Sequence, residues 1–317
     1  MAPIQGITDH VFRTVFTEHF GGFDRAVAPF ITSKQDRKIQ KRYFTDLLPE
    51  NNLRLPVVPQ ILSNHAGDFV HLAHCLCDLG YDTVNWNLGC PFPMVARKKR
   101  GAGLLPYTDR IADFLDAAVP RLQCRLSVKT RLGWHGADEL MELLPVMDRY
   151  PLAELTVHPR TGRQRYEGSV DLAAFAQVLA ATRHSVVYNG DIRTVEDFTY
   201  LAARFPSVDR WMIGRGCVIN PFLPAAIRSG TDDGNNRMER LGRFHDDLFE
   251  RYSALLSGPG HLLDRMKGFW RYLALLFDDS DKTLKTIFKA KSMAAYREQT
   301  ARIFGGEVRI AKRRSTF

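Results

Sequence analysis

One cysteine, Cys90, stands where an apolar segment gives way to a turn, in the run Asn87–Pro91 (NLGCP). The preceding residues Thr83–Asn87 (TVNWN) are typical of a buried strand. Gly89 permits a tight turn, and Pro91 prevents the strand from continuing. The pattern therefore predicts a thiol on the rigid rim of a sheet, where it can meet a ligand.

Two short glycine-containing runs follow later apolar segments, Asn189–Ile192 (NGDI) and Ile213–Gly216 (IGRG). Glycine lets backbone N–H groups approach an anion, and Arg215 adds a fixed positive charge. Barrels of alternating strands and helices often bind phosphate in the loops after strands seven and eight. The pair of runs predicts a phosphate-bearing ligand; two ordinary glycine turns are the alternative.

Three further polar residues end predicted strands: Gln60, Lys129 and His158. A lysine in an apolar strand either points into a cavity or is buried at high cost. Its charge would stabilise an anionic ring such as a reduced flavin. A lone histidine is more often structural. No His, Cys and Glu residues have metal-ligand spacing, and no Ser-His-Asp order or P-loop stands out.

Four consecutive basic residues, Arg97–Arg100 (RKKR), follow Cys90 closely, and Gly101 and Gly103 allow the loop to bend. A flexible basic loop beside a reactive cysteine suits a large, phosphate-rich substrate. A solvated basic surface is the alternative. The segment Ser33–Arg42 adds further positive charge after the second predicted strand.

Composition sets the class of protein. The chain has 317 residues, 45% of them hydrophobic, enough for a large core and a smaller second domain. The net charge of +9 is concentrated in residues 261–317, which hold 13 Lys and Arg against 6 Asp and Glu, and it suggests a polyanionic partner. No apolar run approaches the ~20 residues of a membrane span, and no signal peptide is apparent.

The 5 cysteines are irregularly spaced, which argues against a disulfide framework and for a reducing compartment. We therefore expect a cytoplasmic protein without a membrane anchor. Cys75 and Cys77 lie in the helical pattern Phe69–Leu79, and we interpret them as buried helix cysteines rather than zinc ligands.

Short apolar segments alternate with amphipathic helical segments as far as residue 230. The predicted strands are Ala2–Gln5, Ala26–Ile31, Pro56–Leu62, Thr83–Leu88, Leu126–Arg131, Glu154–His158, Ser185–Asn189 and Arg210–Ile213. The predicted helices between them include Asp109–Leu122, Ala137–Tyr150, Asp171–His184 and Thr194–Phe205, the last with Thr194 as N-cap and a weakened capping box.

Eight strand–helix units over residues 1–230 predict an α/β fold, a parallel (β/α)8 TIM barrel, with an open doubly wound sheet as the rival. In a barrel, the polar residues at the strand ends would all face one mouth. Residues 229–236 form a plausible linker.

Beyond the linker, a small helical bundle is expected over residues 237–305. Its predicted helices are Met238–Leu256, His261–Leu276 and Asp281–Arg302, the first two separated by Gly258–Gly260. A basic tail is expected over residues 306–317, frayed from Val308 to Phe317.

These motifs resemble the tRNA-dihydrouridine synthases. The most specific part is Asn87–Pro91 followed by Gly101–Leu105 (GAGLL). Val128–Gly133 (VKTRLG) and the two glycine-containing runs follow in the family's order, and the resemblance extends from Ala2–Asp9 (APIQGITD) into the helical region.

The resemblance implies an FMN-bearing barrel joined to a helical tRNA-binding domain, with NADPH as reductant. It implies reduction of the C5–C6 double bond of a uridine that leaves its stack. Uridine C6 receives hydride from flavin N5, and Cys90 protonates C5. A monomer is expected. By the same resemblance, the cofactor-binding residues are Pro3 and Ile4 along the flavin, Gln60 at its ring, Lys129 at the pyrimidine edge with His158 beside it, and Asn189, Gly190, Asp191, Gly214 and Arg215 at the phosphate.

Two features depart from the family pattern. The chain begins almost directly at the first predicted strand, so either that strand is short or the natural chain starts upstream. Pro159 replaces a residue that is commonly small, which predicts a shifted loop after strand six.

Two alternatives stay open: an FMN-dependent TIM-barrel oxidoreductase acting on a small molecule, and a tRNA-binding relative without catalysis. The basic helical region and Arg97–Arg100 argue against the first. Cys90, Lys129 and Arg215 argue against the second.

Overall fold

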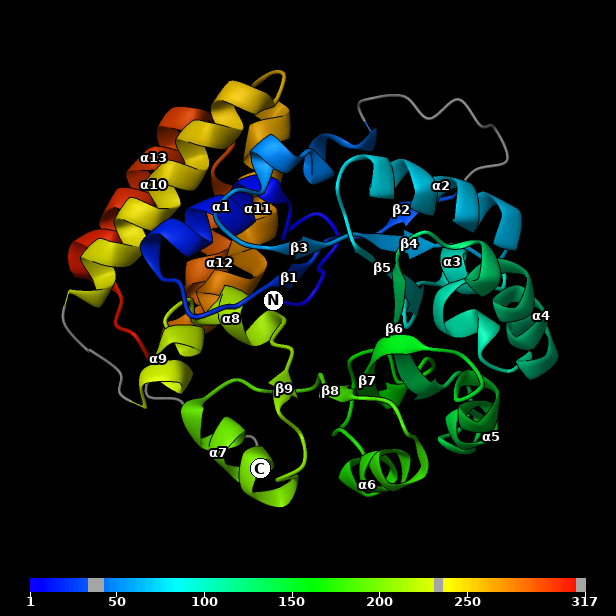
Figure 1. Ribbon diagram of the computed structural model, residues 1–317. Coiled ribbons are helices and arrows are strands. Elements are labelled where there is room, and N and C mark those ends of the chain that lie inside the picture. Colours follow the sequence, from blue (N-terminus) through cyan, green and yellow to red (C-terminus); the bar gives the residue numbers. More distant parts are fainter. Residues whose placement is uncertain (34–42, 231–235, 312–317) are drawn as a thin grey trace.

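The computed structural model describes residues 1–33, 43–230 and 236–311, which form a parallel barrel with a bundle of helices against one side (Figure 1). The predicted basic segment Ser33–Arg42, apart from Ser33, lies outside the described residues. So do residues 231–235 of the predicted linker and residues 312–317 of the predicted tail.

All paired strands are parallel. The larger sheet has the order β2-β4-β5-β6-β7-β8-β9, and β1 pairs with β3. The strands are β1 (Ala26–Val27), β2 (Ile31–Thr32), β3 (Val57–Val58), β4 (Gln60–Leu62), β5 (Thr83–Leu88), β6 (Arg125–Gly133), β7 (Leu152–Thr161), β8 (Val186–Tyr188) and β9 (Arg210–Trp211). Every residue of β5 is buried, as expected for a parallel strand covered on both faces.

Prolines divide the second and third predicted strands. The segment Ala26–Ile31 contains β1 and the start of β2, and Pro56–Leu62 contains β3 and β4. Pro29 and Pro59 lie at the breaks and have no N–H group for the hydrogen-bond ladder. The two halves remain parallel neighbours, since β1 pairs with β3 and β2 pairs with β4.

The first predicted strand, Ala2–Gln5, is wrong as a strand. Instead, the Ala2 N–H donates to the Ile213 carbonyl (2.8 Å), and the Val27 N–H donates to the Met1 carbonyl (3.0 Å). The backbone of residues 1–2 therefore bridges the segment after β9 and β1, and the ring closes as a barrel. Pro3 cannot donate a hydrogen bond, and the chain then turns, with the N–H groups of residues 7 and 8 bonding back to the Ile4 carbonyl.

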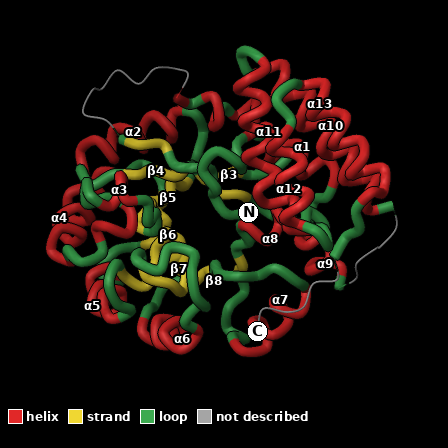
Figure 2. The backbone as a smooth tube through the Cα atoms, turned by 180° about the vertical axis from the view of Figure 1, so that it is seen from behind, coloured by secondary structure: helices red, strands yellow, loops and turns green. Residues whose placement is uncertain are grey.

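Helices line the outside of the strand ring (Figure 2). They are α2 (Ala66–Asp78), α4 (Thr108–Ala118), α5 (Asp138–Met147), α6 (Leu172–Ala181) and α7 (Val195–Arg204). The helix predicted to reach Leu122 stops at Ala118 because Pro120 lies in a following 3-10 turn. The capping box of α7 is complete, with the Asp197 carboxylate accepting the Thr194 N–H (3.0 Å).

β7 is longer than its predicted range of Glu154–His158. It continues through Pro159 to Thr161, with an irregular register against β6 between Arg131 and Gly133. The proline therefore lies within the strand rather than in a displaced loop, and His158 is inside the strand rather than at its end.

The helical bundle contains α10 (Arg237–Leu255), α11 (Pro259–Leu273), α12 (Ser280–Lys289) and α13 (Met293–Arg302), while α8 (Arg215–Ile219) and α9 (Leu223–Ser229) precede it. The single helix predicted over Asp281–Arg302 is two helices, because Ser292 caps a new one: its hydroxyl accepts the Ala295 N–H (3.2 Å). Residues 308–311 are not frayed. The Ala311 N–H donates to the Leu276 carbonyl (2.9 Å), and Ile310 bridges to Phe277.

Barrel and bundle share one hydrophobic core. α1 (His10–His19) lies along α10 (Figure 1), and the Phe12 ring lies 6.0 Å from that of Phe244 and 5.9 Å from that of Phe269. All three phenylalanines are buried. Among the described residues, none of the helices has both the length and the apolar character needed to cross a membrane.

Candidate active site

A cavity of about 630 Å³ opens where the barrel strands end, within the size range of small-molecule sites. All of the residues that the sequence predicted for the site line it: Pro3, Ile4, Gln60, Cys90, Lys129, His158, Asn189, Gly190, Asp191, Gly214 and Arg215. The structure therefore brings together residues from seven separate parts of the ring, because the carboxyl ends of parallel barrel strands converge.

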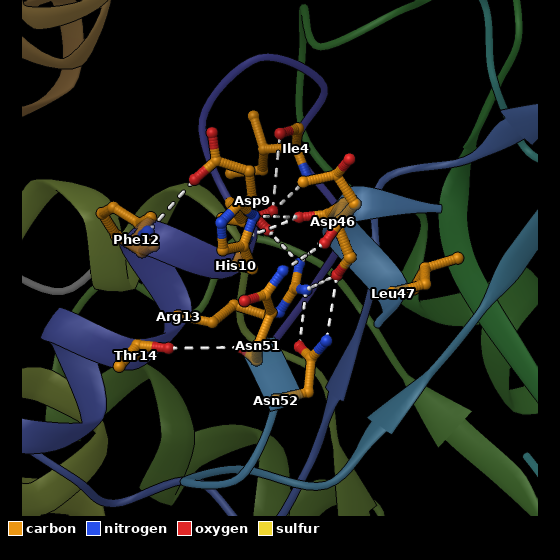
Figure 3. Close-up of polar contacts among 12 residues, drawn as sticks. Ile4, Asp9, His10, Phe12, Arg13, Thr14, Asp46, Leu47, Asn51 and Asn52 are labelled. Carbon is orange, nitrogen blue, oxygen red and sulfur yellow. Dashed lines mark hydrogen bonds and ion pairs between the residues drawn. The ribbon is translucent and has the colours of Figure 1, made fainter. Parts of the chain in front are cut away.

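Hydrogen bonds from neighbouring side chains hold the turn that carries Ile4 in place (Figure 3). The Ile4 N–H donates to Thr8 Oγ1 (2.8 Å), and Arg13 Nη1 donates to the Thr8 carbonyl (2.7 Å). Arg13 Nη2 donates to the Asp46 carbonyl (2.7 Å) and to Asn52 Oδ1 (2.8 Å). The buried Arg13 guanidinium thus ties this wall of the cavity to the segment after β2.

Asn87 positions Cys90. Its Oδ1 accepts the N–H groups of Gly89 (3.0 Å) and Cys90 (2.9 Å), and its Nδ2 donates to Gln60 Oε1 (2.8 Å). Gln60 Nε2 donates in turn to Asn85 Oδ1 (2.7 Å). These amides hold the turn and the Gln60 side chain in one arrangement, leaving Gln60 a second N–H to offer a ligand.

The Cys90 thiol lies at the cavity and is 9% exposed. Burial raises its pKa above the usual value of 9.0, and the Phe92 N–H and the charges of Arg131 and Lys129 offset only part of this. The sulfur is therefore a protonated thiol at neutral pH. It can give a proton, but it is a poor nucleophile.

Lys129 and Arg131 stand two residues apart on β6, so their side chains leave the same face of the strand. Arg131 Nε donates to the Gly89 carbonyl (2.9 Å) and Nη1 to the Thr161 carbonyl (2.8 Å), which ties the Cys90 turn to the end of β7. Lys129 makes no hydrogen bond or ion pair within the part of the chain that the structure describes. Burial and the neighbouring Arg131 charge lower its pKa to about 7.

Three arginine side chains surround Asp191 at one end of the cavity. Its carboxylate pairs with Arg160, with Arg215 Nη2 (3.0 Å) and with Arg193 Nη2 (3.4 Å). Burial raises its pKa, but the Arg160 hydrogen bond and the charges of the three arginines outweigh burial and lower it. Asp191 is therefore ionised, and the arginines are oriented toward one place.

His158 is a neutral member of the site. Burial and the surrounding charges of Arg131 and Lys129 hold its pKa well below the usual value of 6.5. Arg160 Nη1 lies 3.1 Å from its Nε2, which accepts from this guanidinium. His158 can therefore hydrogen-bond to a ligand without adding charge.

The lining suits a flat ring with an anionic tail. Ala2, Pro3, Ile4 and Met212 supply apolar surface, while Gln60 and Lys129 supply donors, and Arg193 and Arg215 supply charge at the Asp191 end. The amine of Lys129 has no partner among the described residues and can therefore donate hydrogen bonds to a bound ligand. These residues fit the flavin that the sequence resemblance implies.

Comparison with known proteins identifies the family. The family model for dihydrouridine synthases (Dus) matches residues 1–302. The chain belongs to the dihydrouridine synthase family. The tRNA-dihydrouridine(16) synthase of Cupriavidus necator is 32% identical over 243 residues, 74% of each chain. The probable tRNA-dihydrouridine synthase 2 of Bacillus subtilis is 29% identical over 274 residues, 84% of this chain and 82% of the relative.

Solved structures confirm the TIM-barrel fold. Morphinone reductase aligns with a TM-score of 0.52 at 10% identity, over 72% of this chain and 83% of that one. Histamine dehydrogenase from Rhizobium sp. 4-9 aligns with a TM-score of 0.53 at 11% identity, over 78% of this chain and 48% of that one. With the family match, the enzyme is a flavin-dependent oxidoreductase of the TIM-barrel type.

Sequence reasoning missed two aromatic residues of the dihydrouridine synthase site. Tyr166, from the loop after β7, lies over the guanidinium groups of Arg215 (4.7 Å) and Arg131 (5.1 Å). Tyr272 reaches the cavity from α11, so the helical bundle completes one wall. Neither lies at a strand end, which was the signal that located the other residues.

Proposed function

We propose that the enzyme binds FMN, takes reducing equivalents from NADPH and reduces the C5–C6 double bond of a uridine in tRNA. The observation that carries this proposal is the buried, protonated Cys90 thiol in the same cavity as the unpaired Lys129 amine and the Asp191-bound arginines. A proton donor, a donor for an electron-rich ring edge and an anion site are then combined in one place.

Different residues of the cavity would bind different parts of the cofactor. Pro3 and Ile4 would pack along the ring, the second N–H of Gln60 would bond to it, and Lys129 would meet its electron-rich edge beside neutral His158. Backbone N–H groups near Gly190 and Gly214, the Asn189 segment and Arg215 would hold the phosphate. Asp191 is ionised and bound to three arginines, so its part is to orient those cations rather than to touch an anion.

Reduction adds one hydride and one proton to the uracil ring. When bound, FMN would supply the hydride that C6 receives. Cys90 gives its proton to C5, and the resulting thiolate recovers a proton from water. The cations of Lys129 and Arg131 lower the cost of that thiolate, since both act to lower the Cys90 pKa.

The uridine must leave its stack to reach the cavity, and exposed basic side chains of the loop after Cys90 and of the bundle grip the tRNA backbone. We propose residues 1–230 as the catalytic domain, 237–305 as the tRNA-binding domain and 306–317 as a basic tail. We also propose that the enzyme acts as a monomer, which sedimentation of the purified protein with and without tRNA will test.

The decisive experiment maps dihydrouridine in tRNA from cells with and without this protein, then repeats the reaction with purified protein, NADPH and an unmodified transcript. We expect one uridine to lose its modification in the deletion and to regain it in vitro. Reduction of free uridine or an enone in place of tRNA would favour a small-molecule oxidoreductase. A colourless protein that FMN cannot reconstitute would favour a binding protein.

A further inference from the structure

Two large apolar side chains stand exposed at the mouth of the cavity. Phe92 is 59% exposed and Met94 is 77% exposed, and both line the same cavity as Cys90. Most large apolar side chains of the described residues are buried in the shared core. Exposed apolar surface on the rim of a site is a recurring sign of a binding surface.

The backbone holds Phe92 rigidly. Pro91 and Pro93 flank it and restrict its conformation. Its carbonyl accepts the N–H groups of Val95 and Ala96 (2.9 Å each) at the start of α3 (Pro93–Ala96). Its own N–H acts to lower the pKa of the Cys90 thiol. The backbone that carries the ring is therefore held at a set position two residues from the proton donor.

Positive charge adjoins this apolar pair. Arg97 and Lys98 follow α3, both are exposed, and neither makes an ion pair within the described ranges. Lys99 and Arg100 differ, because Lys99 Nζ lies over the Tyr107 ring (4.3 Å) and Arg100 Nε donates to Asn64 Oδ1 (3.0 Å). The free charge of the loop thus lies directly after the apolar pair.

We propose that Phe92, with Met94 beside it, is a stacking platform for a nucleobase next to the target uridine, and that Arg97 and Lys98 hold the phosphates of that nucleotide. This inference rests on the proposed function. When the target base leaves its stack, its neighbour loses a stacking partner, and an aromatic ring at the cavity mouth replaces it. An aromatic ring surrounded by cations is the usual platform for single-stranded RNA.

The test is a double-mutant cycle of binding, read without turnover. The flavin-loaded wild type and Phe92→Ala are titrated with a tRNA transcript and with the same transcript carrying an abasic residue on either side of the mapped uridine. For one of the two sides, we expect the wild type to lose about tenfold in affinity on base removal and Phe92→Ala to lose much less. Tyr200→Ala, which removes an exposed aromatic on α7, should respond like the wild type.

A second variant distinguishes loss of the stacking platform from a general disturbance of the loop. Phe92→Trp should retain tRNA affinity, and its added indole fluorescence should be quenched by the intact transcript but not by the abasic one. Equal losses for wild type and Phe92→Ala on both sides, or quenching that ignores the base, would overturn the platform. A protein that binds tRNA with this coupling but reduces none of it would keep the platform and overturn the proposed function instead.

Discussion

Burial disfavours the charged forms of Cys90 and Lys129. It raises the pKa of Cys90, which keeps the thiol protonated, and it lowers the pKa of Lys129 to about 7, which leaves the amine poised between its two forms. A protonated thiol suits proton donation. A poised amine responds to any anion placed beside it, so the two residues are open to direct tests.

Replacing Cys90 should abolish most product formation and spare the rest of the site. For Cys90→Ala we expect dihydrouridine formation to fall by about 10²–10⁴-fold, the usual contribution of a general acid, while bound flavin and its reduction by NADPH remain. Single-turnover reduction of a tRNA transcript measures this. Cys77→Ala, a half-buried cysteine on α2, is the matched control.

The same thiol predicts the alkaline limb of the pH profile. Because its pKa lies above the usual 9.0, the wild-type rate should hold through neutral pH and fall only above about pH 9, as the thiol loses its proton. A Cys90→Ala rate equal to the wild type, or an unchanged alkaline limb in that variant, would remove Cys90 from the reaction.

Lys129 predicts proton uptake on cofactor binding. With a pKa of about 7 in the unliganded site, the amine is largely neutral at pH 8, and an electron-rich ligand edge that accepts its hydrogen bonds favours its charged form. Binding of FMN to the apoprotein at pH 8 should therefore take up a fraction of a proton. Titration calorimetry in two buffers of different ionisation enthalpy measures this. Lys129→Met should lose the uptake; an equal uptake in that variant would contradict the assignment.

At the scale of elements, the loop after β5 is structured rather than flexible, contrary to the expectation from its glycines. α3, a turn and a 3-10 helix over Gly101–Leu104 follow Cys90 directly. Gly101 has a φ of +55°, and a Cβ there would lie 2.7 Å from the Cys90 carbonyl oxygen. The glycines allow close packing behind the thiol, so the loop fixes Cys90 as well as presenting Phe92.

Gly101→Ala should therefore damage the site beyond its effect on backbone strain. Gly80 also has positive φ (+95°), but a Cβ there meets nothing within 4 Å, so Gly80→Ala measures the strain alone, about 1–2 kcal/mol. We expect Gly101→Ala to lose more stability than Gly80→Ala and to slow tRNA reduction as well. Thermal unfolding and single-turnover rates of the two variants measure this. Equal stability and equal rates in the two variants would mean that the loop does not fix the position of the Cys90 thiol.

At the scale of the whole molecule, the proposed catalytic and tRNA-binding domains are joined by a continuous core. Phe12 of α1 contacts Phe244 and Phe269 of the bundle. Polar contacts reinforce the junction, since Asp9 accepts hydrogen bonds from Tyr252 (2.6 Å) and Arg265 (3.0 Å) just after the turn that carries Ile4. The bundle thus supports the wall of the cavity.

Removing a buried side chain at this junction should destabilise the barrel and the helical bundle together. We expect Phe244→Ala to lower the free energy of unfolding by about 3–5 kcal/mol, because the ring is fully buried. Flavin release and loss of helical circular dichroism should coincide in one denaturant transition. Phe288→Ala, 38% exposed on α12, should cost far less. Two separate transitions in the wild type would show that the domains fold independently.

Charge on the loop after Cys90 should govern the salt dependence of tRNA binding. Replacing Arg97 and Lys98 by Gln should weaken binding and reduce the slope of log affinity against log salt by about 1–2, since each phosphate contact contributes about 0.7–0.9. Arg125→Gln is the control, because Arg125 lies at the start of β6 and pairs with Asp82 (2.7 Å). An unchanged slope in the double variant would make this charge irrelevant to tRNA.

The barrel and most of the residues at its mouth could be predicted from the sequence. The prediction that Gln60 and Lys129 end their strands was wrong, because Gln60 begins β4 and Lys129 lies within β6. Alternating apolar segments and amphipathic helices are local patterns, and in a parallel barrel every strand delivers its carboxyl end to the same mouth. Gln60, Lys129 and Arg215 could therefore be assigned to one cavity without knowledge of any long-range contact. The motif around Cys90 indicated the family.

How that cavity is closed and completed could be learned only from the folded chain. Ring closure by residues 1–2, the arginines gathered on Asp191, and the approach of Tyr166 and Tyr272 all depend on contacts between segments far apart in the chain. No local period encodes such contacts, because they arise when loops and the bundle pack over the strand ends. That packing also sets the burial that keeps Cys90 protonated and Lys129 close to neutrality.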